Sequence, residues 1–164
     1  MTTFLISDPH FFHSNMIRYE SRPFTDVDHM NSEIIKRWNS VVKKNDTVIV
    51  LGDFALAPRS AVREIVAKLH GTKWLIMGNH DRGRSVTWWH GVGFAKVYEY
   101  PIIYEGFYIL SHEPVYMNDA MPYINCHGHI HSKVLSGKSY VNVSVERWNY
   151  TPITFESIKK LAGQ

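Results

Sequence analysis

Short apolar runs alternate with stretches of helical periodicity in the first half of the chain. Residues 3 to 7, 47 to 51 and 74 to 77 have the β-branched and aromatic composition of buried strands. Between them, apolar residues recur at helical spacing over residues 30 to 42 and again over residues 61 to 69. This order predicts a β-α-β-α-β unit with parallel strands joined by right-handed crossovers.

Three residue types mark the expected ends of the helices. Asp28 is an N-cap candidate for the first long helix, Pro58 can open the next one, and Thr154 is an N-cap candidate for a final helix. Trp88 and Trp89 lie in a short connection that we expect to be helical.

The second half contains strand-like runs that are shorter and closer together. We expect strands near residues 95 to 104, 107 to 111, 123 to 126, 133 to 136 and 139 to 145. Glu105-Gly106 has the composition of a hairpin turn between two of them. We therefore predict a largely antiparallel second half.

Composition limits the architecture and the cellular context. With 164 residues, 45% of them hydrophobic, we expect a single domain spanning residues 1–164. The net charge of +3 mildly favours an anionic ligand but does not predict nucleic-acid binding. A single cysteine, Cys126, excludes an intrachain disulfide. No run has the length of a membrane span or the pattern of a signal peptide, so we expect a cytoplasmic protein without a membrane partner.

The strand-like runs share a feature that points to function, because five of them end in Asp, His or Asn. These polar clusters are Asp8-Pro9-His10, Gly52-Asp53, Gly78-Asn79-His80-Asp81, Ser111-His112-Glu113 and Gly128-His129-Ile130-His131. Ligands of open α/β folds bind beyond the ends of the strands. We therefore expect the five clusters to converge on one site.

The converging side chains form a set of metal ligands with oxygen and imidazole donors and no thiolate. This set, which suits Mn, Fe, Co, Ni or Zn, comprises Asp8, His10, Asp53, Asn79, His112, His129 and His131. Seven ligands suit two divalent ions bridged by one carboxylate. Two such ions with two ionised aspartates leave a charge of roughly +2 before a hydroxide binds, which favours a phosphate ester.

The order of the motifs, D-x-H, G-D, G-N-H-D, H and G-H-x-H, resembles that of the calcineurin-like metallophosphoesterase superfamily over positions 8 to 131. Ser7-Asp8-Pro9-His10-Phe11, Arg22-Pro23-Phe24 and Leu51-Gly52-Asp53-Phe54 resemble small single-domain bacterial and phage members. The resemblance implies a four-layer α-β-β-α sandwich, of α/β class with mixed sheets, and a dinuclear metal site at strand ends, with manganese favoured.

The resemblance also implies a role for each site residue. Asp8, His10 and His131 would hold the first metal, Asn79, His112 and His129 the second, and Asp53 would bridge the two. His80 would protonate the leaving oxygen, and Asp81 would orient His80.

Two departures from the superfamily narrow the substrate class. Gly52-Asp53 continues into Phe54-Ala55-Leu56 and lacks the Asp-Arg-Gly of protein serine/threonine phosphatases, so we expect no protein phosphatase. The chain is also too short for the capping domains of the DNA-repair nucleases in the superfamily.

The sequence therefore predicts a phosphodiesterase that hydrolyses nucleotides or other small organic phosphodiesters through a metal-bridging hydroxide. A phosphomonoesterase with the same site is the alternative, and a non-catalytic nucleic-acid-binding module is the third reading. His13, Arg22 and Arg82 are candidates for contacts with substrate, although a loop cap for His13 and a surface ion pair for Arg22 are equally consistent with the sequence. His127 and Cys126 are interpreted as structural.

Overall fold

The first sheet is built on the three parallel strands that the sequence predicts. The computed structural model describes residues 1–118 and 120–163. Its elements, in chain order, are β1 (Thr3–Ile6), α1 (Asn15–Tyr19), α2 (Val27–Val41), β2 (Thr47–Val50), α3 (Arg59–Lys68), β3 (Thr72–Ile76), α4 (Val86–Val92), β4 (Lys96–Tyr98), β5 (Ile102–Tyr104), β6 (Tyr108–Leu110), β7 (Ile124–His127), β8 (Tyr140–Asn142), the 3-10 helix η1 (Val145–Arg147), β9 (Ile153–Thr154) and α5 (Phe155–Leu161).

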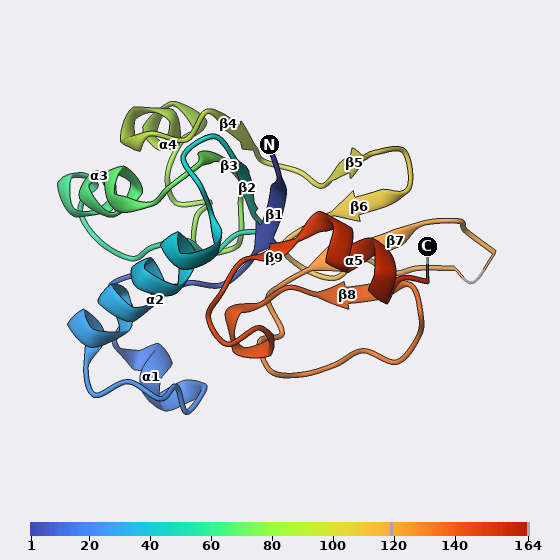
Figure 1. Cartoon of the computed structure of the whole chain (residues 1–164), viewed down its shortest axis with the longest axis horizontal. Coiled ribbons are helices and arrows are strands. Elements are labelled where there is room, and N and C mark those ends of the chain that lie inside the picture. The colour runs from blue at the N-terminus through green and yellow to red at the C-terminus, as the bar shows by residue number, and fades with distance from the viewer. Residues whose placement is uncertain (119, 164) are drawn as a thin grey trace.

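Five strands form the first sheet in the order β4-β3-β2-β1-β9 (Figure 1). β1, β2, β3 and β4 run parallel, and only β9 pairs antiparallel, against β1. The predicted β-α-β-α-β unit is thus confirmed. Because the strands are parallel, the polar residues that follow β1, β2 and β3 emerge at the same edge of the sheet.

Four strands form the second sheet in the order β5-β6-β7-β8. The prediction of a largely antiparallel second half is wrong, because β6 pairs parallel with β7, and β7 with β8. Only the β5–β6 hairpin is antiparallel, and its turn residues Glu105 and Gly106 both have positive φ. The strand predicted at residues 133 to 136 is absent, and these residues form part of an exposed connection. Long connections before β7 and β8 are what permit parallel pairing.

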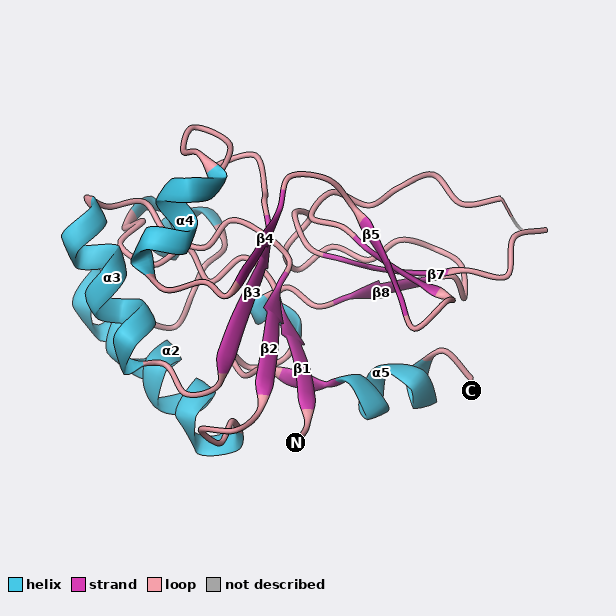
Figure 2. Ribbon diagram, turned by 90° about the horizontal axis from the view of Figure 1, so that it is seen from above, coloured by secondary structure: helices cyan, strands magenta, loops and turns pink. Residues whose placement is uncertain are grey.

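The two sheets face each other, and the helices α2, α3 and α4 cover the outer face of the first sheet (Figure 2). Leu5, Ile49 and Leu51 pack toward the second sheet, whereas Phe4, Val48 and Val50 pack toward the helices. This alternation is the period-two pattern of a strand that is buried on both faces. The predicted α/β class with mixed sheets is confirmed.

Among the described residues, a loop and not a helix covers the outer face of the second sheet. Val115 donates its backbone N–H to Asn125 Oδ1 (3.0 Å), and Met117 donates to the Tyr140 hydroxyl (3.1 Å). α5 instead places Phe155 against Tyr104 and Tyr108, beside the interface of the sheets.

Local capping agrees with the sequence at one helix and differs at another. The Thr154 hydroxyl accepts a hydrogen bond from Ser157 N–H, as an N-cap does. For α2, the cap is Asp26 and not Asp28, because the Asp26 carboxylate accepts from His29 N–H (2.8 Å).

None of the helices in residues 1–118 and 120–163 has the length and apolar character needed to cross a membrane.

Candidate dinuclear metal centre

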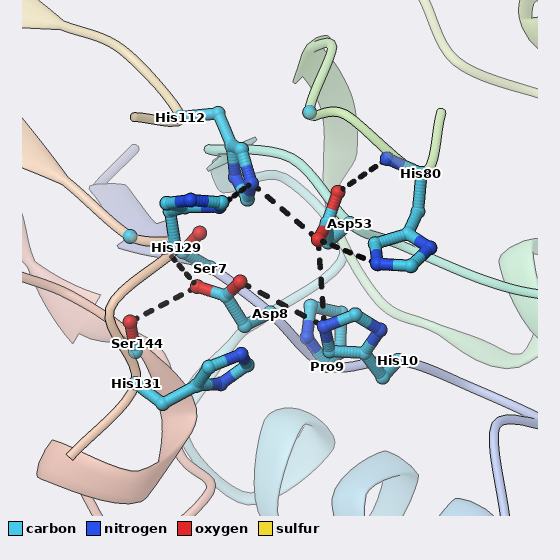
Figure 3. Close-up of polar contacts among 12 residues, drawn as sticks. Ser7, Asp8, Pro9, His10, Asp53, His80, His112, His129, His131 and Ser144 are labelled. Atoms are coloured by element: carbon cyan, nitrogen blue, oxygen red, sulfur yellow. Dashed lines mark hydrogen bonds and ion pairs between the residues drawn. The ribbon is translucent and has the colours of Figure 1, made fainter. Parts of the chain in front are cut away.

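The five polar clusters meet where the two sheets abut. Three of them follow β1, β2 and β3 of the first sheet, and two follow β6 and β7 of the second. Ser7 joins the sheets at this point, because its N–H donates to Val143 O (3.0 Å) and its hydroxyl to Leu51 O. The predicted convergence of the strand ends is therefore what the structure has (Figure 3).

The first group of side chains, which we call the Asp8 cluster, comprises Asp8, His10 and His131. Ligand atoms of the three lie within 4.8 Å of one another. Asp8 Oδ2 accepts hydrogen bonds from His129 N–H and from the Ser144 hydroxyl, both at 2.9 Å, so that Oδ1 faces the cluster. Asp8 Oδ1 lies 3.8 Å from His10 Nε2.

The second group, which we call the His112 cluster, comprises Asn79, His112 and His129. His112 Nε2 lies 3.0 Å from Asn79 Oδ1 and 3.2 Å from His129 Nδ1. The other ring nitrogen, Nδ1, lies 2.8 Å from Leu51 O and donates to that carbonyl. In the neutral ring, this bond leaves the lone pair of His112 on Nε2, which faces the cluster.

Asp53 lies between the two clusters. Its Oδ2 is 3.5 Å from His10 Nε2 and 3.4 Å from His112 Nε2 (Figure 3). Its Oδ1 accepts the backbone N–H of His80 at 3.0 Å. One carboxylate oxygen therefore faces the donor atoms of both clusters, which is the position required of a bridging ligand.

Backbone strain is concentrated at these residues. Five of the ten non-glycine residues with positive φ among those described are Asp8, His10, Asp53, His129 and His131, with φ between 51° and 68°. Non-glycine residues avoid this region, and the strained ones gather at functional sites. The left-handed conformation turns each side chain out of its strand end and toward the others.

Two glycines allow the strand ends to approach closely. Gly52 has φ of +84°, and a Cβ there would overlap His112 Nδ1; a Cβ at Gly128 would overlap the Asp8 carboxylate and the Ser7 hydroxyl. A side chain at either position would displace a candidate ligand.

Burial divides the site into a floor and an open side. Asp8, His10, Asp53 and His112 are buried, whereas Asn79, His80 and His129 are exposed. The side formed by the three exposed residues is therefore open to a substrate, and His131 is partly exposed as well.

The protonation states of the buried histidines depend on their burial and on the carboxylates of Asp8 and Asp53. Burial lowers the pKa of His10 well below its ordinary value, so the imidazole is neutral. Burial alone would lower the pKa of His112, but its hydrogen bond to Asp53 and the charge of Asp8 raise it to about 9. Burial opposes ionisation of Asp53, yet the interactions with His112 bring its pKa to about 2.

These residues fit a pair of divalent cations. Asp8 Oδ1 and His10 Nε2 are buried polar atoms without a hydrogen-bond partner, and both face the space between the side chains. Such atoms carry a free-energy penalty unless a ligand satisfies them. Carboxylate oxygen, amide oxygen and imidazole nitrogen are the donors that first-row divalent metals accept.

Comparisons with known proteins agree with this geometry. A family model, calcineurin-like phosphoesterase, matches residues 1–160. The chain belongs to this family. It is a metal-dependent phosphoesterase, and the family generally uses a dinuclear divalent metal site.

Two similar sequences and one similar solved structure extend this comparison. The phosphoesterase is 36% identical to the uncharacterized protein MJ1445 of Methanocaldococcus jannaschii, over 96% of this chain and 89% of the relative. It is 33% identical to the Gene 66 protein of Mycobacterium phage L5, over 48% of this chain and 39% of that protein. The crystal structure of AQ665 from Aquifex aeolicus, a protein of unknown function, superposes with a TM-score of 0.76 and 26% identity over 98% of each chain.

His80 lies on the open side of the phosphoesterase site. Its side chain is 44% exposed, and its Nε2 is 3.9 Å from Asp53 Oδ2. The ring also lies against those of His10 and His13. His80 is thus placed where a leaving group could receive a proton.

Asp81, predicted to orient His80, binds backbone N–H groups rather than the His80 ring. Its carboxylate is fully buried, with Oδ2 accepting from the N–H groups of Asp53 (2.7 Å) and Gly78 (2.9 Å), and Oδ1 from Phe54 N–H (3.1 Å). Burial raises the pKa of Asp81 to about 7, and the N–H donors act in the opposite direction. The buried Asp81 carboxylate therefore fixes the backbone of the two loops that carry Asp53 and His80.

The three candidates for substrate contacts occupy different positions. His13 faces the site, with its Nδ1 3.3 Å from His10 Nδ1, and Arg82 is half-exposed and paired with Glu113 (2.8 Å). Their contacts with substrate stay predictions. The prediction that Arg22 contacts substrate is wrong, because its side chain has no exposed surface and lies behind the Asp8 cluster.

Sequence reasoning missed Ser144 and Glu146. The Ser144 hydroxyl binds Asp8, and Glu146 Oε1 lies 3.3 Å from His131 Nδ1. Both residues follow β8, beyond the last recognisable motif, and neither belongs to a local pattern. Only the register of β8 brings them to the site.

Proposed function

We propose that this phosphoesterase is a phosphodiesterase that hydrolyses nucleotides or other small organic phosphodiesters, with manganese as the favoured metal. The position of Asp53 Oδ2, about equally distant from His10 Nε2 and His112 Nε2, supports the paired-metal chemistry of this proposal. In this arrangement the Asp8 cluster would hold one ion, the His112 cluster would hold the other, and Asp53 would bridge them.

The chemistry proposed for the centre is in-line hydrolysis. Paired divalent ions polarise phosphoryl oxygens and lower the pKa of coordinated water. His80 would donate a proton from its imidazole to the departing oxygen, because its ring lies beside Asp53 on the open side. His13, whose ring centroid is 5.6 Å from that of His80, would limit the room beside the leaving group.

The arginines near the motifs favour a diester over a monoester. A monoester carries a further negative charge that the protein must compensate, but each of these guanidinium groups is already engaged. Arg82 pairs with Glu113, and Arg84 donates to the carbonyls of Ala55 (2.9 Å) and Ala57 (2.7 Å). Arg22 is buried.

The test is hydrolysis of a chromogenic phosphodiester and of its matched monoester by metal-stripped protein, before and after addition of Mn²⁺, Ni²⁺ or Zn²⁺. We expect diester cleavage to return with metal, and Mn²⁺ to restore it best. A preference for the monoester would assign the same site to a phosphomonoesterase. Binding of anionic polynucleotide that survives chelation, without hydrolysis, would indicate a binding module instead.

His80→Ala tests the assignment of the proton donor. An aryl leaving group needs little protonation, so the variant should lose far less activity on an aryl diester than on an alkyl diester, where a general acid contributes roughly 10²–10⁴-fold. His13→Ala is the matched control, because it removes a neighbouring imidazole without removing the proposed acid. Equal losses on both substrates in His80→Ala would contradict the assignment.

A further inference from the structure

A buried ion pair lies directly behind the Asp8 cluster. Arg22 Nη2 is 2.6 Å from Glu146 Oε1, and the exposed fractions of the two side chains are 0% and 5%. Arg22 comes from the loop after α1, and Glu146 belongs to η1, 124 positions later in the chain. A buried ion pair is weak evidence for stability, because desolvation offsets the attraction of the charges. The contacts of this pair suggest a different use.

Arg22 uses all five of its N–H donors inside the protein. Nη2 donates to Asp8 O (2.8 Å) and to Glu146 Oε1, and Nη1 donates to Pro9 O (3.0 Å) and to Met30 Sδ (3.5 Å). Nε completes the set with a second bond to Glu146 Oε1 (3.0 Å). The guanidinium thereby holds two successive carbonyls of the segment in which Asp8 and His10 both have positive φ.

Glu146 extends the same contact to the third member of the cluster. Its Oε1, which already accepts from Arg22, lies 3.3 Å from His131 Nδ1. A metal-ligating histidine commonly donates its second ring N–H to a carboxylate, which fixes the tautomer and the orientation of the ring. His131 would then direct Nε2 toward Asp8 and His10.

The ion pair serves the two clusters unequally. Arg22 and Glu146 touch Asp8 and His131 directly and reach His10 through Pro9 O. Their link to the His112 cluster is indirect, through the Asp8 carboxylate that accepts His129 N–H, and His112 itself contacts Leu51 O, Asn79 and Asp53. We propose that the Arg22–Glu146 pair is a positioning device for the Asp8 cluster alone, so that it sets the metal affinity of one position of the centre and not of the other. This inference rests on the proposed dinuclear site.

The test compares metal binding by the whole protein and by Glu146→Ala, with Mn²⁺ alone as the probe. Equilibrium dialysis gives the number of ions bound, and electron paramagnetic resonance separates a coupled pair from the resolved hyperfine pattern of an isolated ion. For wild type we expect two ions and a coupled spectrum. Loss of an outer carboxylate costs about 10–100-fold in metal affinity. Glu146→Ala should therefore retain one tight ion with the isolated pattern, and regain the coupled spectrum and kcat only at correspondingly higher Mn²⁺.

Two further variants separate positioning from loss of charge. Glu146→Gln keeps an oxygen that can accept from Arg22 and His131, so it should recover most of the lost affinity. Glu20 offers a carboxylate oxygen within 4.8 Å of ligand atoms of His131 and Glu146, but its hydrogen bond runs to Ser132. Glu20→Gln removes a charge from the same neighbourhood without touching the ion pair, and it should bind both ions as wild type does.

A third variant guards against simple unfolding. Arg22→Met combined with Glu146→Leu removes both charges and leaves neither unpaired, a change that buried ion pairs often tolerate. It should fold, as judged by its melting transition without metal, and still lose the same ion.

Parallel loss of both ions in a folded variant, or retention of both at wild-type affinity, would overturn the positioning role while leaving the phosphoesterase proposal intact. Failure of the wild-type protein to bind any ion would contradict both the positioning role and the proposed function.

Discussion

The two clusters of the metal centre are supported in different ways. The Asp8 cluster is backed by charged and hydroxyl side chains from distant parts of the chain, namely Arg22, Ser144 and Glu146. The His112 cluster is backed through main-chain groups, because His112 Nδ1 donates to Leu51 O and the N–H groups of the loop carrying Asp53 donate to the buried Asp81 carboxylate. A substitution on the Asp8 side removes a contact with a candidate ligand or with its own backbone, whereas a substitution of Asp81 acts on the ligands only by moving the loop that carries Asp53.

This contrast gives the clusters different weak points. The Asp8 cluster depends on long-range contacts that form only when η1 docks behind β1. The His112 cluster depends on the Gly78 and Gly52 loops, which pack closely enough that a Cβ on either would overlap a candidate ligand. We therefore expect substitutions of Arg22, Ser144 or Glu146 to change metal affinity, and substitutions of Gly52 or Gly78 to change the fold of the site as well.

Asp53→Asn should have the largest effect, because it changes the one residue that both clusters share. The amide oxygen can still accept the His80 N–H, so the loop should persist, but the negative charge between His10 and His112 is lost. The variant should lose both ions and hydrolysis. These losses should exceed the roughly 10–100-fold loss of metal affinity or activity that follows removal of a residue bonded to a metal ligand. Metal analysis beside turnover checks this, and an active variant that retains both ions would exclude Asp53 as the bridge.

Asp81→Asn tests the main-chain support of the His112 side. The carboxylate of Asp81 accepts three N–H groups with two oxygens, whereas an asparagine has one oxygen and one NH2 group. At least one of the three N–H groups would therefore face the NH2 group, which cannot accept a hydrogen bond. We expect a loss of about 1–3 kcal/mol in the free energy of unfolding, the penalty of an unsatisfied buried group. Metal affinity should fall as well, because Asp53 is displaced. Urea unfolding with and without Mn²⁺ measures both effects.

Asp46→Asn is the matched control for that variant. The Asp46 carboxylate also accepts backbone N–H groups, from Thr2 (2.8 Å) and Lys43 (2.9 Å), but it precedes β2 and lies at the opposite end of that strand from Asp53. It should destabilise the protein without changing metal affinity. Equal effects of the two variants on Mn²⁺ binding would show that global stability, and not the loop, controls the site.

The sequence predicts the candidate ligands at the strand ends better than it predicts the residues that support the Asp8 cluster. Asp53, Asn79 and His112 each lie one residue beyond an apolar run, so local pattern and the rule for parallel strands place them together. Glu146 has no such local signal, and its position depends on β8 pairing parallel with β7, whereas the sequence favoured antiparallel strands there. Strand pairing over long connections is a tertiary choice that composition does not reveal.

Arg22 shows the same limit for a single side chain. Near the motifs, an arginine is as consistent with phosphate binding as with an ion pair, and the sequence holds no sign that it is buried. The deciding facts are the carbonyls of Asp8 and Pro9 and the carboxylate of Glu146, which together consume its donors. Such a set of acceptors exists only in the folded chain.

The pH dependence of metal binding provides a smaller but cleaner test of the His112 cluster. His112, with a pKa raised to about 9, is protonated at pH 7, and an ion can bind only the deprotonated nitrogen. Binding must therefore displace a proton, and affinity at this cluster should rise about tenfold per pH unit until the pH reaches that pKa.

Proton release on addition of Mn²⁺ in weak buffer at pH 7, followed over the range to pH 9, measures this dependence. An affinity at the His112 cluster that is flat between pH 7 and pH 9 would show that His112 is neutral before the ion arrives. His10, whose pKa is lowered by burial, contributes no such proton, so the Asp8 cluster should not share this release through His10.

The smallest effect is expected at the rim, where Arg82 and Glu113 form an ion pair that is the exposed counterpart of Arg22–Glu146. Their side chains are 51% and 38% exposed, so solvent screens the attraction. Glu113→Gln should change the free energy of unfolding by about 0–1 kcal/mol, and it should leave Mn²⁺ stoichiometry unchanged. It also frees the Arg82 guanidinium, so KM for an anionic diester should fall slightly if Arg82 reaches the substrate, while kcat stays constant. Thermal melting, dialysis and steady-state kinetics on the same variant separate these outcomes. A loss of one ion in Glu113→Gln would mean that an exposed pair can set metal affinity as the buried one does, and the contrast between side-chain and main-chain support would then no longer explain the centre.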